Sequence, residues 1–181
     1  MSNTKTFTRI FTIADYEEEE NWLREQSRKG LHLQKMIQPF LYIFEVGEPE
    51  DVIYRLDYRN DRGDQDYTQM FADYGWECCG RCFGWIYFRK PASTVTCEEE
   101  GELFSDSESR LSMVQHVMMT RMLPLLVVFL CILIPQWMNI MDRPGEGVLK
   151  IIFTVLMVLY VILILHCGRK LYRLRKKLKK F

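Results

Sequence analysis

The sequence has few histidines and lacks the motifs from which catalytic and metal-binding sites are usually built. Its three histidines, at positions 32, 116 and 166, lie far apart in the chain. It contains no glycine-rich phosphate loop, no nucleophile elbow and no paired catalytic carboxylate motif. These absences favour a protein that is not an enzyme, and we expect no cofactor.

Only one cysteine pair has the spacing of a metal or redox motif. Cys79 and Cys82 form a Cys-x-x-Cys sequence beside Cys78, in the stretch GWECCGRCFGWIYFRKP. A structural zinc site needs four ligands, usually supplied as two such pairs, and His32 and Cys97 are a weak supplement. A redox pair normally opens a helix, whereas this one falls across a strand end and a turn. The stretch therefore predicts a β-hairpin with reduced thiols and no metal.

Charge is unevenly distributed along the chain. Residues 1–96 hold 12 Lys and Arg against 16 Asp and Glu, whereas residues 148–181 hold nine Lys and Arg and no acid. Two apolar segments of 20 residues, 122–141 and 148–167, lie between these regions. Each is long enough to cross the hydrocarbon core of a bilayer as a helix. The N-terminus lacks the apolar core of a secretory signal.

The flanks of the two apolar segments predict their orientation. The tail at 168–181 is rich in Lys and Arg, while the loop DRPGEG between the segments has one Arg and two acids. The positive-inside rule then places both termini in the cytoplasm and the loop outside. We expect a transmembrane hairpin at 122–167, kinked at Pro124 and Pro135, and a basic tail that contacts anionic lipid rather than nucleic acid.

The N-terminal part alternates between strand and helix patterns. A strand at 7–13 is followed by a helix that Asp15 and Glu18 open as a capping box and Gly30 ends. Two strands at 31–36 and 40–46 then form a hairpin with Pro39 in its turn. The acids at 17–20 are expected to be solvated at the positive end of the helix dipole.

The same order recurs about 45 residues later in the chain. A strand at 52–58, a helix at 65–74 ended by Gly75, and a hairpin at 76–90 form the second unit. The predicted fold class is α+β, with a duplicated βαββ unit (about 7–46 and 52–90) in a domain at 1–95. The two units are expected to form one six-stranded, mostly antiparallel sheet with both helices on one face. An acidic linker and juxtamembrane helix at 96–121 follow, with Ser105 and Glu108 as a second capping box.

Several stretches carry a family resemblance, namely FTIADYEEEENWLREQSRKG, VIYRLDY, YGWE through YFRKP, and LFSDSESRL. Over about residues 7–115 the chain resembles the uncharacterised bacterial family catalogued as domain of unknown function 2812. The resemblance implies a multi-pass protein of the bacterial cell membrane whose spans are C-terminal. Members are often encoded beside PadR-type repressors. The resemblance supplies no catalytic residues.

A doubled βαββ unit is also similar to the gyrase-inhibitor-like ligand-sensor fold, whose exposed sheet face forms a groove for small, often cationic, aromatic ligands. Strand alternation turns a mixture of rings and charges away from the helices if the residues packed on the helices are Phe11, Ile13, Leu56, Tyr58, Ile86 and Phe88. The residues expected to line such a groove are Tyr42, Arg55, Asp57, Glu77, Trp85 and Tyr87. Alternatively these residues form a second packed face or a dimer interface, and the opposite register would bury the aromatic rings.

Two classes of function are consistent with these patterns. The first is a non-enzymatic cytosolic sensor or protein-interaction domain, anchored in the lipid bilayer, that binds an amphipathic small ligand, a repressor partner or a second copy of the chain. The second is an accessory subunit of a membrane transporter or stress-response complex, in which the spans do the main work. The spans have few polar residues beyond Gln136, Asn139 and Thr154, which favours the first class.

Overall fold

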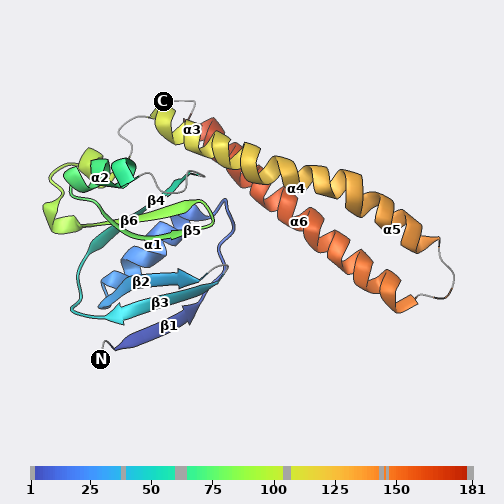
Figure 1. Cartoon of the computed structure of the whole chain (residues 1–181), viewed down its shortest axis with the longest axis horizontal. Helices are drawn as coiled ribbons and strands as arrows, with labels where there is room; N and C mark the ends of the chain where they lie inside the picture. Colours follow the sequence, from blue (N-terminus) through green and yellow to red (C-terminus); the bar gives the residue numbers. More distant parts are fainter. Residues whose placement is uncertain are drawn as a thin grey trace. The chain divides into compact units, whose positions relative to one another are not determined.

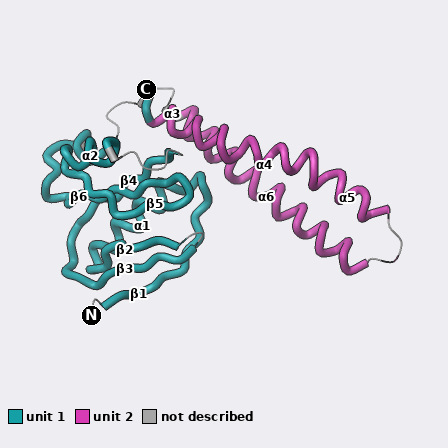
Figure 2. Tube along the Cα trace, viewed as in Figure 1, with its two compact units in different colours: residues 1–109 teal, residues 110–181 magenta. Residues whose placement is uncertain are grey.

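The computed structural model describes residues 3–37, 40–59, 65–103, 107–142, 145 and 147–178 (Figure 1). The chain divides into two compact units, Met1–Ser109 and Arg110–Phe181 (Figure 2). The first unit is α+β and contains two three-stranded antiparallel sheets. The second contains long apolar helices. The α+β class and the two apolar helices are therefore confirmed.

Each sheet has the same order of strands. Sheet A runs β1 (Thr4–Thr8), β3 (Leu41–Val46), β2 (Leu31–Ile37), and sheet B runs β4 (Val52–Tyr58), β6 (Trp85–Pro91), β5 (Glu77–Cys82). The strands thus form two sheets where the sequence predicts one of six strands. The first strand also lies earlier than the predicted 7–13. The predicted turn at Pro39 lies outside the described residues.

Helix α1 (Tyr16–Ser27) packs against both sheets. Trp22 contacts Tyr42 of β3 edge to face, with ring centroids 4.9 Å apart, and Tyr16 stacks on Trp85 of β6 at 5.7 Å. Buried aromatic rings from both sheets therefore pack on this helix, which Figure 1 shows between the two sets of strands.

Helix α2 (Gln65–Asp73) covers the other face of sheet B. Its Phe71 lies against Phe88 of β6, with centroids 4.9 Å apart, in a cluster with Ile53 and Ile86. The prediction that both helices lie on one face is thus wrong for sheet B. Consecutive residues of β4 and β6 are buried, so both faces of this sheet need a cover.

The structure agrees with the predicted C-terminal end of α1 but not with the predicted cap at its N-terminal end. Gly30 has a φ of 76°, in the left-handed region that a glycine favours after a helix. Asp15 makes no side-chain capping bond to α1, so the predicted capping box is not formed. Its carboxylate instead accepts a hydrogen bond from the Thr12 amide at 2.8 Å and closes the turn before the helix.

Most of one long interrupted helix belongs to the second unit. It consists of α3 (Ser107–Val117), α4 (Leu123–Val128) and α5 (Ile134–Met141), with π-helical turns at Met118–Met122 and Phe129–Leu133. Each π turn directly precedes a segment with proline at its start, Pro124 or Pro135. Proline lacks the backbone donor that an α-helix needs, and the wider turn accommodates that loss. The predicted capping residue Ser105 lies outside the described residues.

Helix α6 (Gly147–Leu178) runs antiparallel to this first helix. The Tyr160 hydroxyl donates to the Leu125 carbonyl at 2.8 Å, and Lys150 Nζ donates to the Met141 carbonyl at 2.7 Å. By length and composition, Ser109–Met141 and Gly147–Lys176 could each cross a membrane. Most of their apolar side chains are exposed, as expected for helices that face lipid rather than a protein core.

Candidate functional site

Two adjacent acids of α1, Glu19 and Glu20, are each only 6% exposed. The prediction that both are solvated is therefore wrong. They lie three and four residues after Tyr16, and Leu23 follows at the same spacing, so all four occupy one face of the helix. That face is directed at the sheets. The helical period alone could have indicated this burial, because the acids continue the stripe of buried residues.

Glu19 joins the two sheets through a single oxygen. Its Oε1 accepts hydrogen bonds from the Tyr42 hydroxyl of β3 at 2.8 Å and from the Tyr87 hydroxyl of β6 at 2.7 Å. Both tyrosines are almost completely buried. We call Glu19, Tyr42 and Tyr87 the Glu19 cluster. It places one carboxyl group between aromatic rings, away from water.

Burial dominates the electrostatics of the Glu19 cluster. It raises the pKa of the Glu19 carboxyl above its ordinary value, against the opposing effect of the two tyrosine hydrogen bonds. The pKa values of Tyr42 and Tyr87 are raised by burial and by the neighbouring carboxylate, so both hydroxyls remain donors. A desolvated carboxylate flanked by aromatic rings is an environment that favours a cation.

Glu20 links α1 to the edge of sheet B. Its Oε1 accepts a hydrogen bond from the backbone amide of Leu56 at 2.8 Å, and its Oε2 lies 3.6 Å from Nη1 of Arg55. Arg55 also binds both carboxylate oxygens of Glu102, at 2.8 and 3.1 Å. Glu102 follows the 3-10 turn at Glu98–Gly101, within the predicted linker. The start of that linker is thus bound to the α+β unit beside α1.

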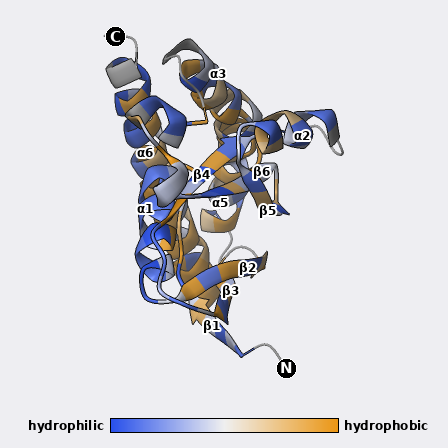
Figure 3. Ribbon diagram, turned by 90° about the vertical axis from the view of Figure 1, so that its left-hand side faces the viewer, coloured by the Kyte–Doolittle hydropathy of each residue, from blue (hydrophilic) through white to orange (hydrophobic). Residues whose placement is uncertain are grey.

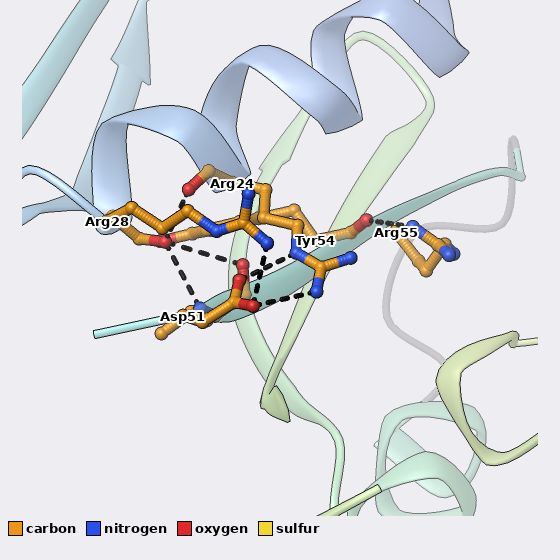
Figure 4. A network of polar contacts seen from close by, with 7 residues as sticks. Arg24, Arg28, Asp51, Tyr54 and Arg55 are labelled. Atoms are coloured by element: carbon orange, nitrogen blue, oxygen red, sulfur yellow. Dashed lines mark hydrogen bonds and ion pairs between the residues drawn. The ribbon is translucent and has the colours of Figure 1, made fainter. Parts of the chain in front are cut away.

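A third acid, Asp51, fixes the end of α1 to the start of β4 (Figure 4). It accepts hydrogen bonds from Arg24 at 2.7 and 2.8 Å and from Arg28 at 2.8 Å. These hydrogen-bonded guanidinium groups hold the pKa of Asp51 well below its ordinary value. Arg24 and Asp51 are about one-third exposed. Because the two side chains bind each other, we assign this contact a structural role.

Three of the six residues predicted to line a groove are directed at α1. Tyr42 and Tyr87 belong to the Glu19 cluster, and Trp85 is buried against Tyr16. The structure therefore brings these three aromatic residues together around one helix. They lie in the interior of the unit rather than on an open sheet face.

The other three predicted residues are placed elsewhere. Arg55 and Asp57 pair across sheet B with Phe88 and Ile86, on the face that α2 covers, and Asp57 accepts a hydrogen bond from the α2 residue Tyr67 at 2.6 Å. Glu77 is exposed and forms a two-point ion pair with Arg89. Since Leu56 pairs with Tyr87, the register assumed for the groove, which placed them on opposite faces, is wrong.

The cysteine pair lies in a hairpin, as the sequence predicts. Cys78, Cys79 and Cys82 all belong to β5, which pairs with β6. Burial raises the pKa of the Cys79 thiol to about 12, the opposite of the shift that activates a redox thiol. Among the described residues, no group of three or more His, Cys, Asp and Glu side chains could hold a metal ion.

A known protein family matches the part of the chain that contains all of these sites. The family described as Protein of unknown function (DUF2812) matches residues 15–128, more than half of the chain. The chain belongs to the DUF2812 family. No curated protein and no solved structure matches it.

The DUF2812 match spans the elements from α1 to α4. It therefore contains the Glu19 cluster, the Glu20–Arg55–Glu102 contacts and the start of the first apolar helix. Helices α5 and α6 lie beyond the matched residues.

Proposed function

We propose that this DUF2812 protein is a non-enzymatic sensor or interaction protein, held at the bacterial cell membrane by its two apolar helices. The observation that carries the proposal is that one chain joins a packed α+β unit to two helices with exposed apolar side chains. Such helices are stable when lipid covers them. The α+β unit supplies buried polar residues that can respond to a bound molecule.

The proposed orientation has both termini in the cytoplasm. Nine Lys and Arg and no acid occur in residues 148–181, and α6 ends among them. The connection between the apolar helices, DRPGEG, has one Arg against two acids. This asymmetry supports a hairpin that enters and leaves the membrane on the cytoplasmic side.

The α+β unit is, we infer, a duplicated βαββ unit, as the sequence predicts. In each half the first strand pairs with the third, the third pairs with the second, and a helix separates the first two strands. Gly30 and Gly75 each follow a helix, and both glycines have a positive φ. The register also shifts at Leu33/Lys35 in β2 and at Cys78/Gly80 in β5, again 45 residues apart. Two related halves would then share α1 at their junction.

The Glu19 cluster is the proposed ligand-responsive site of this junction. The best-matched ligand is an amphipathic organic cation, because its charge would compensate the desolvated Glu19 carboxylate and its rings would pack on the surrounding tyrosines. Entry would separate Tyr42 from Tyr87 and so change the relation of the two sheets. Glu20, next to Glu19, could pass that change through Arg55 to Glu102.

A protein partner such as a PadR-type repressor is the alternative ligand of the same unit. In that case the membrane helices would hold the repressor at the membrane, away from the DNA that it binds. The two cases differ in whether a small molecule alone stabilises the protein.

The proposal is tested with the full chain. Membranes are first extracted with alkaline carbonate, from which a protein with two spans should not be released. The detergent-purified protein is then heated with amphipathic organic cations and with neutral molecules of the same shape. A cation-specific rise in melting temperature, lost in Glu19→Gln and kept in Glu25→Gln, supports ligand sensing. Glu25 is the control because it lies on α1 but is exposed.

Release by carbonate would contradict the membrane assignment. If no cation stabilises the protein, the ligand role of the Glu19 cluster is wrong, and cross-linking in native membranes then tests the protein-partner alternative.

A further inference from the structure

A pocket of about 670 Å³ lies along the C-terminal half of α6. Its lining includes Ile162, Leu165, His166, Arg169, Lys170 and Arg173. These positions recur every three or four residues, so they share one face of the helix. The described lining residues therefore form one stripe along α6. The volume of the pocket is in the range of small-molecule sites.

The stripe changes character along the helix. Ile162 and Leu165 are apolar and about half exposed. Arg169 and Arg173, one and two turns further on, are cationic and exposed. At 1.5 Å per residue, the stripe from Ile162 to Arg173 extends over roughly 16 Å. One end of the pocket thus suits hydrocarbon and the other suits an anion, and the hydropathy colours of Figure 3 show the hydrophilic residues near the C-terminal end of α6.

This gradient coincides with the end of a candidate membrane span. The span Gly147–Lys176 has 30 residues, more than the roughly 20 that cross the hydrocarbon core. If its apolar part is centred in the bilayer, the turn with Arg169 and Arg173 falls at the level of the lipid head groups. The helix supplies no carboxylate to these cations, because residues 148–181 contain no acid.

We propose that this pocket binds an anionic phospholipid. The phosphate lies against Arg169 and Arg173, whose planar guanidinium groups match its oxygens, and the first part of an acyl chain lies on Ile162 and Leu165. The apolar end distinguishes this ligand from free phosphate, which would leave Ile162 and Leu165 without a partner. The net charge of the lipid distinguishes it from a zwitterionic lipid, whose own cation competes with the arginines. The inference rests on the proposed insertion of α6 in a membrane.

The test uses the full chain in nanodiscs of phosphatidylcholine that contain a minor fraction of phosphatidylglycerol. Native mass spectrometry then measures which lipids remain bound after release from the nanodisc. We expect phosphatidylglycerol to be retained in preference to phosphatidylcholine. Arg169→Gln with Arg173→Gln should reduce this retention by about tenfold or more, since each cation contributes roughly a fivefold effect near a lipid surface.

The control variant loses the same number of positive charges, but at residues outside the pocket lining. Arg175→Gln with Lys176→Gln removes two cations from the same helix, at positions that do not line the pocket. It should keep most of the retained lipid, and Arg169→Lys with Arg173→Lys should keep an intermediate amount. Equal losses in both Gln pairs would overturn the proposal, because they would indicate unspecific attraction to the tail.

Two further outcomes would also overturn it. One is equal retention of phosphatidylcholine and phosphatidylglycerol by the unaltered chain. The other is displacement of the lipid by millimolar inorganic phosphate, which would make free phosphate the ligand. Alkaline extraction of the same variants separates this inference from the proposed membrane anchoring, because loss of the pocket should leave both helices inserted.

Discussion

Tyr42 and Tyr87 belong to different sheets, yet both donate a hydrogen bond to the same oxygen of Glu19. The two residues also lie 45 positions apart, at corresponding places in the two halves of the unit. A carboxylate on the helix between the sheets therefore satisfies two equivalent hydroxyls at once. Buried hydroxyls that lose such a partner cost about 1–3 kcal/mol each, so the contact has a structural role whether or not a ligand binds there.

The Glu19 carboxyl should make the stability of the α+β unit fall as pH rises. Its pKa is raised in the folded state, so its contribution is complete below the unfolded value, about 4.3, and is lost as pH rises through the folded value. Glu19→Gln keeps a carbonyl acceptor but cannot ionise. The variant should therefore gain stability relative to the unaltered chain as pH increases from about 4.5 to 7.

Denaturant unfolding of the full chain in detergent, followed by tryptophan fluorescence, measures this slope. Glu25→Gln on the exposed face of α1 is the matched control and should leave the slope unchanged. Equal slopes for Glu19→Gln and the unaltered chain would show that Glu19 is not desolvated as described.

The Arg55 ion pairs should hold the predicted linker on the α+β unit. Arg55→Gln removes the two-point contact with Glu102 and the ion pair with Glu20, whose side chain is 7% exposed. We expect a loss of roughly 2 kcal/mol in unfolding free energy and faster protease cleavage between residues 96 and 103. Limited proteolysis with mass spectrometry measures the cleavage site.

Arg89→Gln is a useful comparison, since its ion pair with the exposed Glu77 also crosses between neighbouring segments. It should leave cleavage at 96–103 unchanged. Identical cleavage in Arg55→Gln and the unaltered chain would mean that Glu102 does not tether the linker.

Cys79 should react more slowly than Cys97 with a neutral maleimide. Burial holds its pKa near 12, so almost none of it is thiolate at pH 8. Cys97 is exposed and serves as the reference thiol in the same chain. Mass spectrometry should show Cys97 modified at least about tenfold faster. Rapid modification of Cys79, or bound zinc that is lost in Cys79→Ser with Cys82→Ser, would instead indicate an active thiol site.

The sequence predicted most elements of the α+β unit because local patterns determine them. The strand 52–58 matches β4, and Gly75 follows α2 as expected, since period and helix termination are local properties. The sequence is a poorer guide to which face of each helix and strand is buried. Nothing local requires α1 to be shared by both sheets, so the pattern predicts the aromatic rings of β6 on an open face, and tertiary packing determines their burial instead. The charge of Glu19 predicts exposure to solvent, although this residue continues the buried stripe of the helix.

The two helix-ending glycines should respond unequally to substitution. Sequence symmetry alone predicts similar effects, since both have positive φ, 76° at Gly30 and 81° at Gly75. Their surroundings differ. A Cβ at residue 30 would lie 2.5 Å from the Gly47 carbonyl oxygen, whereas one at residue 75 would meet the flexible Lys90 side chain at 3.5 Å.

Gly75→Ala should therefore cost only the strain of a left-handed alanine, about 1 kcal/mol. Gly30→Ala must also move the backbone at Gly47, which adds roughly 1–3 kcal/mol. Thermal unfolding of the full chain should show the larger decrease for Gly30→Ala, while carbonate extraction remains unchanged for both. Equal decreases would mean that the segment around Gly47 yields at little cost, and a larger effect at Gly75 would contradict the close approach of Gly30 to that segment.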